Sequence, residues 1–211
     1  MSRVSLKKSG DSAFILGICG GSGSGKSMFS SILKDIGFLV LDADVIYKEL
    51  LSASKDLLHS IAVAFGNHVI LEDGSLNRSE LANIVFADEK KLAILNSLTH
   101  PAVVAEITTR INEYKKSTPR ARIAIDAPLL YESGLNSLCD KVVAITASRD
   151  ARIERIVARD RISTNAAIAR IDSQSSLALA LADCVINNDG SQEDLRNTVD
   201  KIINDYNLKE I

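Results

Sequence analysis

The sequence lacks an excess of charge of either sign. Its 211 residues include 25 Lys and Arg against 27 Asp and Glu, which gives a formal net charge of −2. A chain this close to neutral has no overall field to draw it onto nucleic acid or an anionic membrane, and we expect neither as a partner. A phosphate-bearing ligand must then be held by local positive charge.

Long apolar runs and cysteines are also scarce. No apolar stretch reaches the roughly 18 residues of a membrane-spanning helix, and the run after the first basic residues is too short for a signal peptide. Cys19, Cys139 and Cys184 have neither metal-binding spacing nor an even number. We expect a cytoplasmic protein with reduced thiols and a loose tail over residues 1–12. Cys19 would be an oxidation site only if it were exposed.

A glycine-rich segment stands out against this background. ILGICGGSGSGKS (15–27) matches the pattern G-x-x-x-x-G-K-[ST], the Walker A loop whose backbone amides cradle phosphates. A short apolar run over 14–18 precedes it, and apolar residues at helical spacing follow it as far as Gly37. Because the motif is meaningful only between a strand and a helix, this context favours a phosphate loop over an ordinary glycine turn.

Apolar residues, at 46% of the chain, suffice for the core of one α/β domain. The pattern predicts strands over 14–18, 38–44, 122–126, 140–146 and 183–188, and a last helix over 194–206. Residues 45–117 are predicted to form helices, interrupted by a turn at Asp73-Gly74. Helices should start near Ser79 and Asp88, and Pro101 suits a first helical turn. Alternating strands and helices predict a doubly wound parallel sheet.

Carboxylates follow the second and third predicted strands. Ligands of such sheets bind beyond the carboxyl ends of the strands, where the glycine-rich loop, Asp42, Asp44 and Asp126 should all lie. Asp42 alone is more typical of a helix cap, whereas Asp44 and Asp126 beside a phosphate loop indicate function.

An arginine-rich helix is expected between the last two strands. Arg152, Arg155 and Arg159 share one of its faces, because residues three and four apart are neighbours on a helix. They would either bind phosphate or form a solvated face paired with Glu154 and Asp160. The sequence leaves both readings open.

The whole chain resembles the dephospho-CoA kinase family. The matching pieces run in order: GGSGSGKS (20–27), DAD (42–44), FG…DGSLNR (65–78), HP (100–101), DAPLLYESG (126–134), ER…RD (154–160), RI..Q (170–174) and AD.VINN.G (182–190). Three features depart from the family. Ser22 replaces a bulky aliphatic residue, Cys19 replaces a threonine, and the segment 174–183 is short and lacks a basic residue.

The resemblance implies a single P-loop kinase chain, 1–211, with a five-stranded parallel sheet. The nucleotide-binding core would comprise 13–44, 118–150 and 176–208, the helical CoA-binding insertion 45–117 and the lid 151–175. The implied reaction is ATP-dependent phosphorylation of the ribose 3′-hydroxyl of dephospho-CoA, with Mg²⁺. The sequence leaves the oligomeric state open.

Motif and resemblance together assign the site residues. Asp44 is the expected general base, and Lys26, Arg155 and Arg159 would stabilise the transferred phosphoryl group. Ser27 and Asp126 would hold magnesium, and Asp44, Arg78, His100 and Leu129 would contact the acceptor. The expected ATP-binding residues are Gly21, Ser22, Gly23, Ser24, Gly25, Lys26, Ser27, Met28, Asn187 and Asn188.

Rival functions predict different sequences. A GTPase should carry an Asn-Lys-x-Asp segment, which this chain lacks. A nucleoside or nucleotide kinase, the main alternative, would share the loop, acids and lid but is not expected to carry HP followed by DAPLLYE. A nucleotide-binding regulator without turnover should have lost reactive residues, and all are present.

Overall fold

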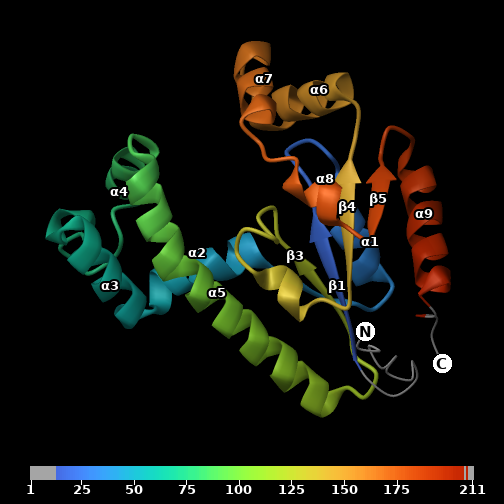
Figure 1. Cartoon of the computed structure of the whole chain (residues 1–211), viewed down its shortest axis with the longest axis horizontal. Helices are drawn as coiled ribbons and strands as arrows, with labels where there is room; N and C mark the ends of the chain where they lie inside the picture. The colour runs from blue at the N-terminus through green and yellow to red at the C-terminus, as the bar shows by residue number, and fades with distance from the viewer. Residues whose placement is uncertain (1–12, 207, 209–211) are drawn as a thin grey trace, which may run out of the picture.

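A five-stranded, all-parallel sheet forms the centre of the computed structural model, which describes residues 13–206 and 208 (Figure 1). The strand order is β2-β3-β1-β4-β5. The strands are β1 (Phe14–Cys19), β2 (Leu39–Asp42), β3 (Arg122–Asp126), β4 (Lys141–Thr146) and β5 (Cys184–Asn187). The expected doubly wound α/β architecture is confirmed.

Helices connect these strands and cover both faces of the sheet. The α-helices are α1 (Lys26–Asp35), α2 (Ala43–Ala53), α3 (Lys55–Phe65), α4 (Arg78–Phe86), α5 (Glu89–Ser117), α6 (Arg149–Asp160), α7 (Thr164–Asp172), α8 (Leu177–Leu181) and α9 (Gln192–Asp205). Two short 3-10 turns, η1 (Asn67–Val69) and η2 (Leu135–Leu138), lie between them.

Two apolar clusters sandwich the sheet. One joins α1 and α9 to residues such as Leu16 and Val143, and the other joins α2 and the later part of α5 to residues such as Ile123. The strands are apolar on both faces because parallel strands are covered by helices on both sides. The sheet and its loop therefore form a well-packed platform for a site at the strand ends.

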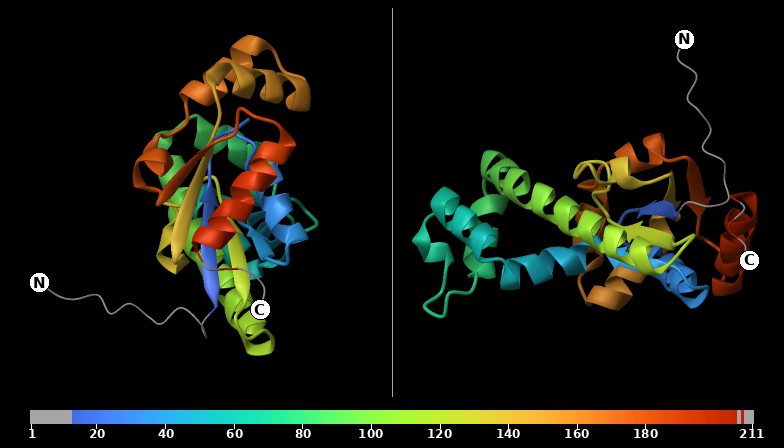
Figure 2. Two further views of the ribbon diagram at one scale, coloured as in Figure 1. Left: turned by 90° about the vertical axis from the view of Figure 1, so that its right-hand side faces the viewer. Right: turned by 90° about the horizontal axis from the view of Figure 1, so that it is seen from below.

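The insertion, residues 45–117, and the lid, residues 151–175, each have an apolar cluster of their own. Residues of α2, α3, α4 and the early part of α5 form one cluster, whereas α6 and α7 pack on each other around Ile156, Ala167 and Ile171. Figures 1 and 2 show α3 and α4 away from the sheet, and Figure 1 shows α6 and α7 beyond the carboxyl ends of β4 and β5. The division of the chain into these parts stays a prediction, but the later part of α5 packs with the sheet.

Local structure departs from two sequence expectations. The second strand ends at Asp42, and Asp44 lies in the first turn of α2 rather than in a strand, because Asp42 caps that helix by accepting from Val45 N at 3.0 Å. Pro101 lies inside α5 and not in a first turn. A proline removes one backbone hydrogen bond, which this 29-residue helix tolerates by packing along its length.

Other local expectations are confirmed. Asp88 caps α5, and Gly74 adopts the positive φ (83°) of a tight turn. Asn77 caps α4, which begins at Arg78, one residue before the expected start at Ser79. The expected tail over 1–12 lies outside the described residues. Within the described part of the chain, no helix is long and apolar enough to cross a membrane.

Candidate active site

The glycine-rich segment is a loop between β1 and α1. Gly25 precedes α1 with a left-handed φ of 94°, and no side chain caps the helix. A Cβ at Gly25 would also collide with the Asn188 amide, so only glycine fits there. The uncapped amides at the start of α1, together with the helix dipole, make an anion site.

Lys26, the first residue of α1, forms an ion pair with Asp126 at the end of β3. The side chains are 15% and 5% exposed, so the pair is largely buried. Ser30 Oγ, one turn later on α1, donates to the other carboxylate oxygen of Asp126 at 2.6 Å. The end of β3 beside the start of α1 thus places the ammonium of Lys26 on a carboxylate that Ser30 also holds, and a bound phosphate could attract the ammonium away from it.

The strand register brings the predicted acids to one edge. Ile18 is paired with Asp126 and Asp126 with Asp42, so both carboxylates lie where β1 leads into the phosphate loop. Asp42 caps α2 as the pattern indicated. Asp44 follows two residues later and is the acid whose carboxylate has no part in that cap.

The electrostatic environment distinguishes Asp44. Although Asp44 is exposed, the protein around it displaces enough water to raise the pKa of its carboxyl. Lys26 opposes this rise, while the charges of Asp42 and Asp126 add to it. A carboxylate with a raised pKa accepts a proton more readily than an ordinary aspartate.

The arginines of the predicted face of α6 have two kinds of partner, the phosphate loop and a carboxylate of the same helix. Arg152 Nε donates to Ser22 O at 3.0 Å, and Arg155 Nη1 donates to Gly23 O at 3.2 Å. Arg159 instead pairs with Asp160 and is 59% exposed. Two of the three arginines thus touch the phosphate loop, and the third has the carboxylate partner that the solvated-face reading described.

The predicted adenine-side residues also differ from each other. Asn188 is buried, its Nδ2 donates to Ser24 O at 2.9 Å, and its carbonyl accepts from Arg155 at 2.8 Å. Asn187 is exposed at the end of β5. Asn188 therefore holds the backbone of the loop, whereas the exposed Asn187 has its side chain hydrogen-bonded to Asp189.

Arg78, the first residue of α4, bonds to α2, the helix that carries Asp44. Its guanidinium donates to Lys48 O at 3.3 Å and Ser52 Oγ at 3.1 Å, both on α2. Burial raises the pKa of Tyr47, also on α2, and the positive charge of Arg78 opposes that rise. Arg78 thus lies one to two turns along α2 from the candidate base.

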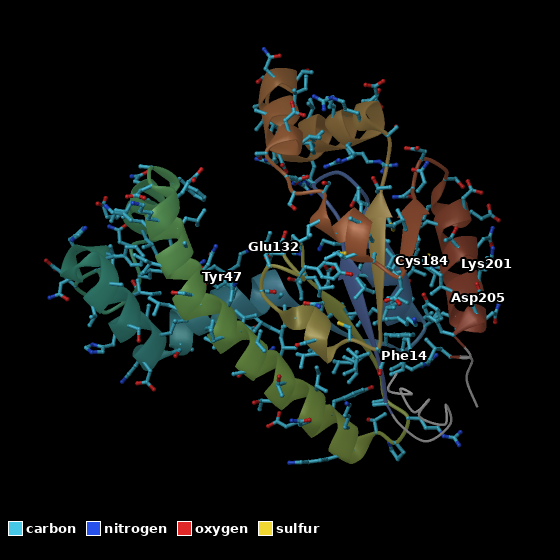
Figure 3. All side chains as sticks on the ribbon, in the orientation of Figure 1. Phe14, Tyr47, Glu132, Cys184, Lys201 and Asp205 are labelled. Atoms are coloured by element: carbon cyan, nitrogen blue, oxygen red, sulfur yellow. The ribbon has the colours of Figure 1, made fainter. Side chains whose placement is uncertain are left out.

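His100 lines an open cleft of about 840 Å³ between α5 and the loop after β3. Tyr131 and Glu132 form the opposite wall, and Figure 3 shows Glu132 on the side of that loop that faces the insertion. Leu129, in the same loop, is 49% exposed. Among the described residues no hydrogen bond or ion pair joins His100 to Arg78, and neither Arg78 nor Leu129 lines the cleft of His100.

Comparison with known proteins decides the family. The family model for dephospho-CoA kinase matches residues 14–194. The chain belongs to the dephospho-CoA kinase family. A dephospho-CoA kinase of Carboxydothermus hydrogenoformans is 37% identical over 93% of this chain and 96% of its own. As a member of this family the protein is a kinase, a transferase that binds nucleotide.

Two solved structures share the fold of this chain. TT1252 from Thermus thermophilus superposes with a TM-score of 0.76 at 27% identity, over 92% of this chain and 97% of its own. A dephospho-CoA kinase from Campylobacter jejuni gives a TM-score of 0.59 at 27% identity, over 91% and 96%. The P-loop kinase fold expected from the sequence is therefore confirmed.

The structure of this family member brings two further residues onto the loop. The sequence offers Arg152 only as part of an arginine face that either binds phosphate or is solvated, and Gln174 only as part of the RI..Q match. Both contact Ser22 of the phosphate loop. The signal available in the sequence was the position of Gln174 just beyond the lid helices.

Cys19 is not the oxidation site that its place beside the loop allowed. It is fully buried, and burial, with the charge of Glu132 adding, raises the pKa of its thiol to about 11. Its Sγ lies 3.6 Å from Val143 O. A thiol that stays protonated and buried is a packing residue and a poor nucleophile.

The residues at the loop fit a magnesium ion held mainly through phosphate. Among the described residues, no three His, Cys, Asp or Glu side chains gather as a metal cage. Ser27, in the first turn of α1, and Asp126, at the end of β3, offer a hydroxyl and a carboxylate beside the anion site. Magnesium prefers oxygen ligands and commonly keeps waters and substrate phosphates, so a two-residue protein contribution suits it.

Proposed function

We propose that this kinase transfers the γ-phosphate of ATP to the ribose 3′-hydroxyl of dephospho-CoA, giving CoA and ADP. The observation that carries the proposal is the meeting, at one sheet edge, of the uncapped phosphate loop, the Lys26–Asp126 pair and the carboxylate of Asp44. Family membership supplies the acceptor. A cytoplasmic location stays a prediction from the sequence.

The loop and Lys26 bind the triphosphate. The amides from Gly23 to Ser27 surround the β-phosphate, and Met28 follows them along α1. Lys26 leaves Asp126 and bridges the β- and γ-phosphates, because a doubly charged phosphate group outcompetes one carboxylate for the ammonium. Phosphoryl transfer depends mostly on such positioning and charge stabilisation.

The lid arginines stabilise charge on the transferred group. Arg155 already lies against Gly23, so a small movement directs its planar guanidinium to the γ-phosphate. Arg159 contributes only after it leaves Asp160. Asn187 lies at the end of β5, the side of the loop on which we place the adenine.

Asp44 accepts the proton of the acceptor hydroxyl. Its raised pKa makes it a stronger base than an ordinary aspartate, and its place beside Lys26 puts it next to the γ-phosphate. His100 binds the rest of the acceptor in the cleft between α5 and the loop after β3. Arg78, which contacts α2, and the exposed Leu129 contribute from outside that cleft.

Ser27 and Asp126 would hold the magnesium ion that accompanies ATP. When bound, magnesium supplies charge neutralisation on the phosphate oxygens. Asp126 would become available to magnesium once Lys26 bound the phosphates, while Ser30 keeps the carboxylate oriented. The movement of Lys26 would thus serve the binding of both ATP and magnesium.

A coupled assay tests the proposal. ATP is offered with dephospho-CoA, adenosine, uridine and nucleoside monophosphates, and ADP production is measured. We expect turnover with dephospho-CoA to exceed that with adenosine or AMP by about 100-fold or more, because remote binding energy of the pantetheine arm supports the transition state. Equal turnover of AMP and dephospho-CoA would favour a nucleotide kinase instead.

A further inference from the structure

Both ends of the lid meet on one residue of the phosphate loop. Ser22 N donates to Gln174 Oε1 at 3.1 Å, and Gln174 Nε2 donates to Ser22 Oγ at 2.9 Å. Arg152 Nε donates to Ser22 O at 3.0 Å, and Arg152 Nη2 donates to Gln174 Oε1 at 2.6 Å. The backbone amide, carbonyl and hydroxyl of Ser22 are thus all bonded to the lid. We call Ser22, Arg152 and Gln174 the latch.

The lid depends on polar contacts of this kind. Its apolar cluster is internal to α6, α7 and the turn between them. Arg155 adds bonds to Gly23 and Asn188, and Ser148 N, just before α6, donates to Asp189 at 2.7 Å. Gln174 anchors the exit of the lid, beyond α7, whereas the other contacts lie near its entry.

Gly21 makes room for the latch. A Cβ at this position would lie 2.5 Å from Arg152 Nη2 and nearer still to Gln174 Oε1. Real Cβ atoms do not approach other atoms so closely, so a side chain at position 21 would force the ends of Arg152 and Gln174 out of the positions they hold in the latch. The loop sequence and the lid sequence are matched at this point.

The latch also leaves the charge of Arg152 available. Other arginines of the two lid helices pair with carboxylates: Arg149, at the start of α6, pairs with Asp172, and both Arg159 and Arg170 pair with Asp160. Among the described residues, no carboxylate pairs with Arg152, whose bonds go to a carbonyl and a neutral amide. An amide orients the guanidinium through its oxygen without cancelling the charge that a phosphate needs.

We propose that Gln174 is a positioning residue for phosphoryl transfer. It holds the exit of the lid on Ser22 and orients Arg152 toward the loop while leaving that arginine's charge uncancelled. The amide of Ser22 then serves Gln174 and not the phosphate. This inference deepens the proposed function, since the lid arginines act on the same triphosphate.

Limited trypsin cleavage tests the latch without reference to any substrate. Trypsin cuts after the lid arginines when the lid opens, and cleavage of a transiently open segment tracks its open population. We expect Gln174→Ala to speed cleavage within 149–170 by about fivefold or more, with Gln192→Ala, an exposed glutamine on α9, unchanged. Cleavage of Gln174→Ala at the wild-type rate would overturn the proposal.

A double-mutant comparison separates the latch from a general loss of stability. Ser22→Ala removes only the hydroxyl acceptor and keeps the backbone bonds. If the two side chains act together, the double variant, Ser22→Ala with Gln174→Ala, should be cleaved at the same rate as Gln174→Ala alone. If the rate increases of the two single variants multiply in the double variant, the two side chains act independently and the latch is contradicted.

Gln174→Glu tests the charge argument. A carboxylate can accept from Ser22 and Arg152 as the amide oxygen does, so trypsin resistance should stay at the wild-type level. The carboxylate in Gln174→Glu neutralises the charge of Arg152, so the KM for ATP should rise about tenfold in that variant. Gln174→Ala instead loosens the lid, so its kcat should fall about tenfold. Unchanged kinetics in both variants would refute the positioning role, even if dephospho-CoA kinase activity is confirmed. Failure of every acceptor to react would refute the proposed function and leave the trypsin result to decide the latch.

Discussion

The sheet edge and the lid hold their positive charges in different ways. At the edge, Lys26 is buried against the carboxylate of Asp126, and strand register sets the position of that carboxylate. In the lid, Arg152 and Arg155 are held by uncharged oxygens of the loop, of Gln174 and of Asn188. The edge has many packed neighbours, whereas the lid is joined to it by a few polar bonds.

This difference assigns separate roles to the two regions. A buried ion pair beside packed strands is positioned before any ligand binds, because the sheet cannot shift without losing its core. A small two-helix unit held by hydrogen bonds opens at low cost, as moving elements of enzymes must. Substitutions at the edge should therefore change the chemistry, and substitutions in the lid should change closure.

The largest effect is expected for Lys26→Ala. ATP binding should weaken and turnover should nearly vanish, because the charge between the phosphates is lost. The buried carboxylate of Asp126 also loses its cation, which should lower the stability by about 3 kcal/mol. Thermal unfolding and steady-state kinetics measure the two effects.

A second substitution separates these two consequences of Lys26→Ala. Adding Asp126→Asn removes the unpaired charge, so the melting temperature should recover while turnover stays absent. Recovery of turnover together with stability would show that Lys26 serves only the fold.

Asp44→Asn should come next. General-base catalysis typically contributes about 10²–10⁴-fold, so kcat should fall by that range, with ATP affinity nearly unchanged. The raised pKa means that the folded protein disfavours the ionised carboxylate, so Asn should not lower the melting temperature at pH 7. Asp42→Asn is the matched control, since Asn still caps α2. If Asp42→Asn were the inactive variant, the base would be assigned to the wrong carboxylate.

The pH dependence gives an independent measure of Asp44. A base acts only when it is deprotonated, so kcat should fall as the pH drops through its pKa. Because that pKa is raised, the fall should begin at a higher pH than for an ordinary aspartate. This acidic limb should vanish in Asp44→Asn, and an identical pH profile in both proteins would argue against a base role.

Smaller effects are expected within the lid, where two arginines can be compared. Arg155→Lys keeps the charge but loses the planar fork, and kcat should fall about tenfold, equivalent to ~1.4 kcal/mol. The sequence predicts a similar loss for Arg159→Lys, whereas the pairing of Arg159 with Asp160 favours a smaller one. Measuring kcat for both variants decides whether the loss in Arg159→Lys is similar to that in Arg155→Lys or smaller. Equal, negligible losses would mean that the arginine face is only solvated surface.

The smallest effect concerns Cys19 at the sheet edge. With its pKa raised to about 11 and its side chain buried, this thiol should not react with iodoacetamide at pH 8, and activity should persist. Mass spectrometry of the labelled protein checks this, with the half-buried Cys184 as an internal comparison. Rapid labelling of Cys19 with loss of activity would show that the edge opens more than its packing indicates.

Much of the fold could be predicted from local patterns in the sequence alone. The phosphate loop, the strand–helix alternation, the caps at Asp42 and Asp88 and the face of α6 depend on neighbours within a few residues. For these features the sequence and the structure agree, because the physical causes are short-range: glycine conformations, hydrophobic periodicity and capping. The motif order was specific enough to indicate the family.

Only the tertiary structure decided which distant residues meet. Lys26 pairs with a carboxylate 100 residues away, and Ser22 bonds to Gln174, which is 152 residues away. No local pattern specifies such pairs, since they depend on strand order and on how the lid packs. For the same reason Pro101 could be misread as a helix start: tertiary packing along α5 outweighs the one backbone bond that proline removes.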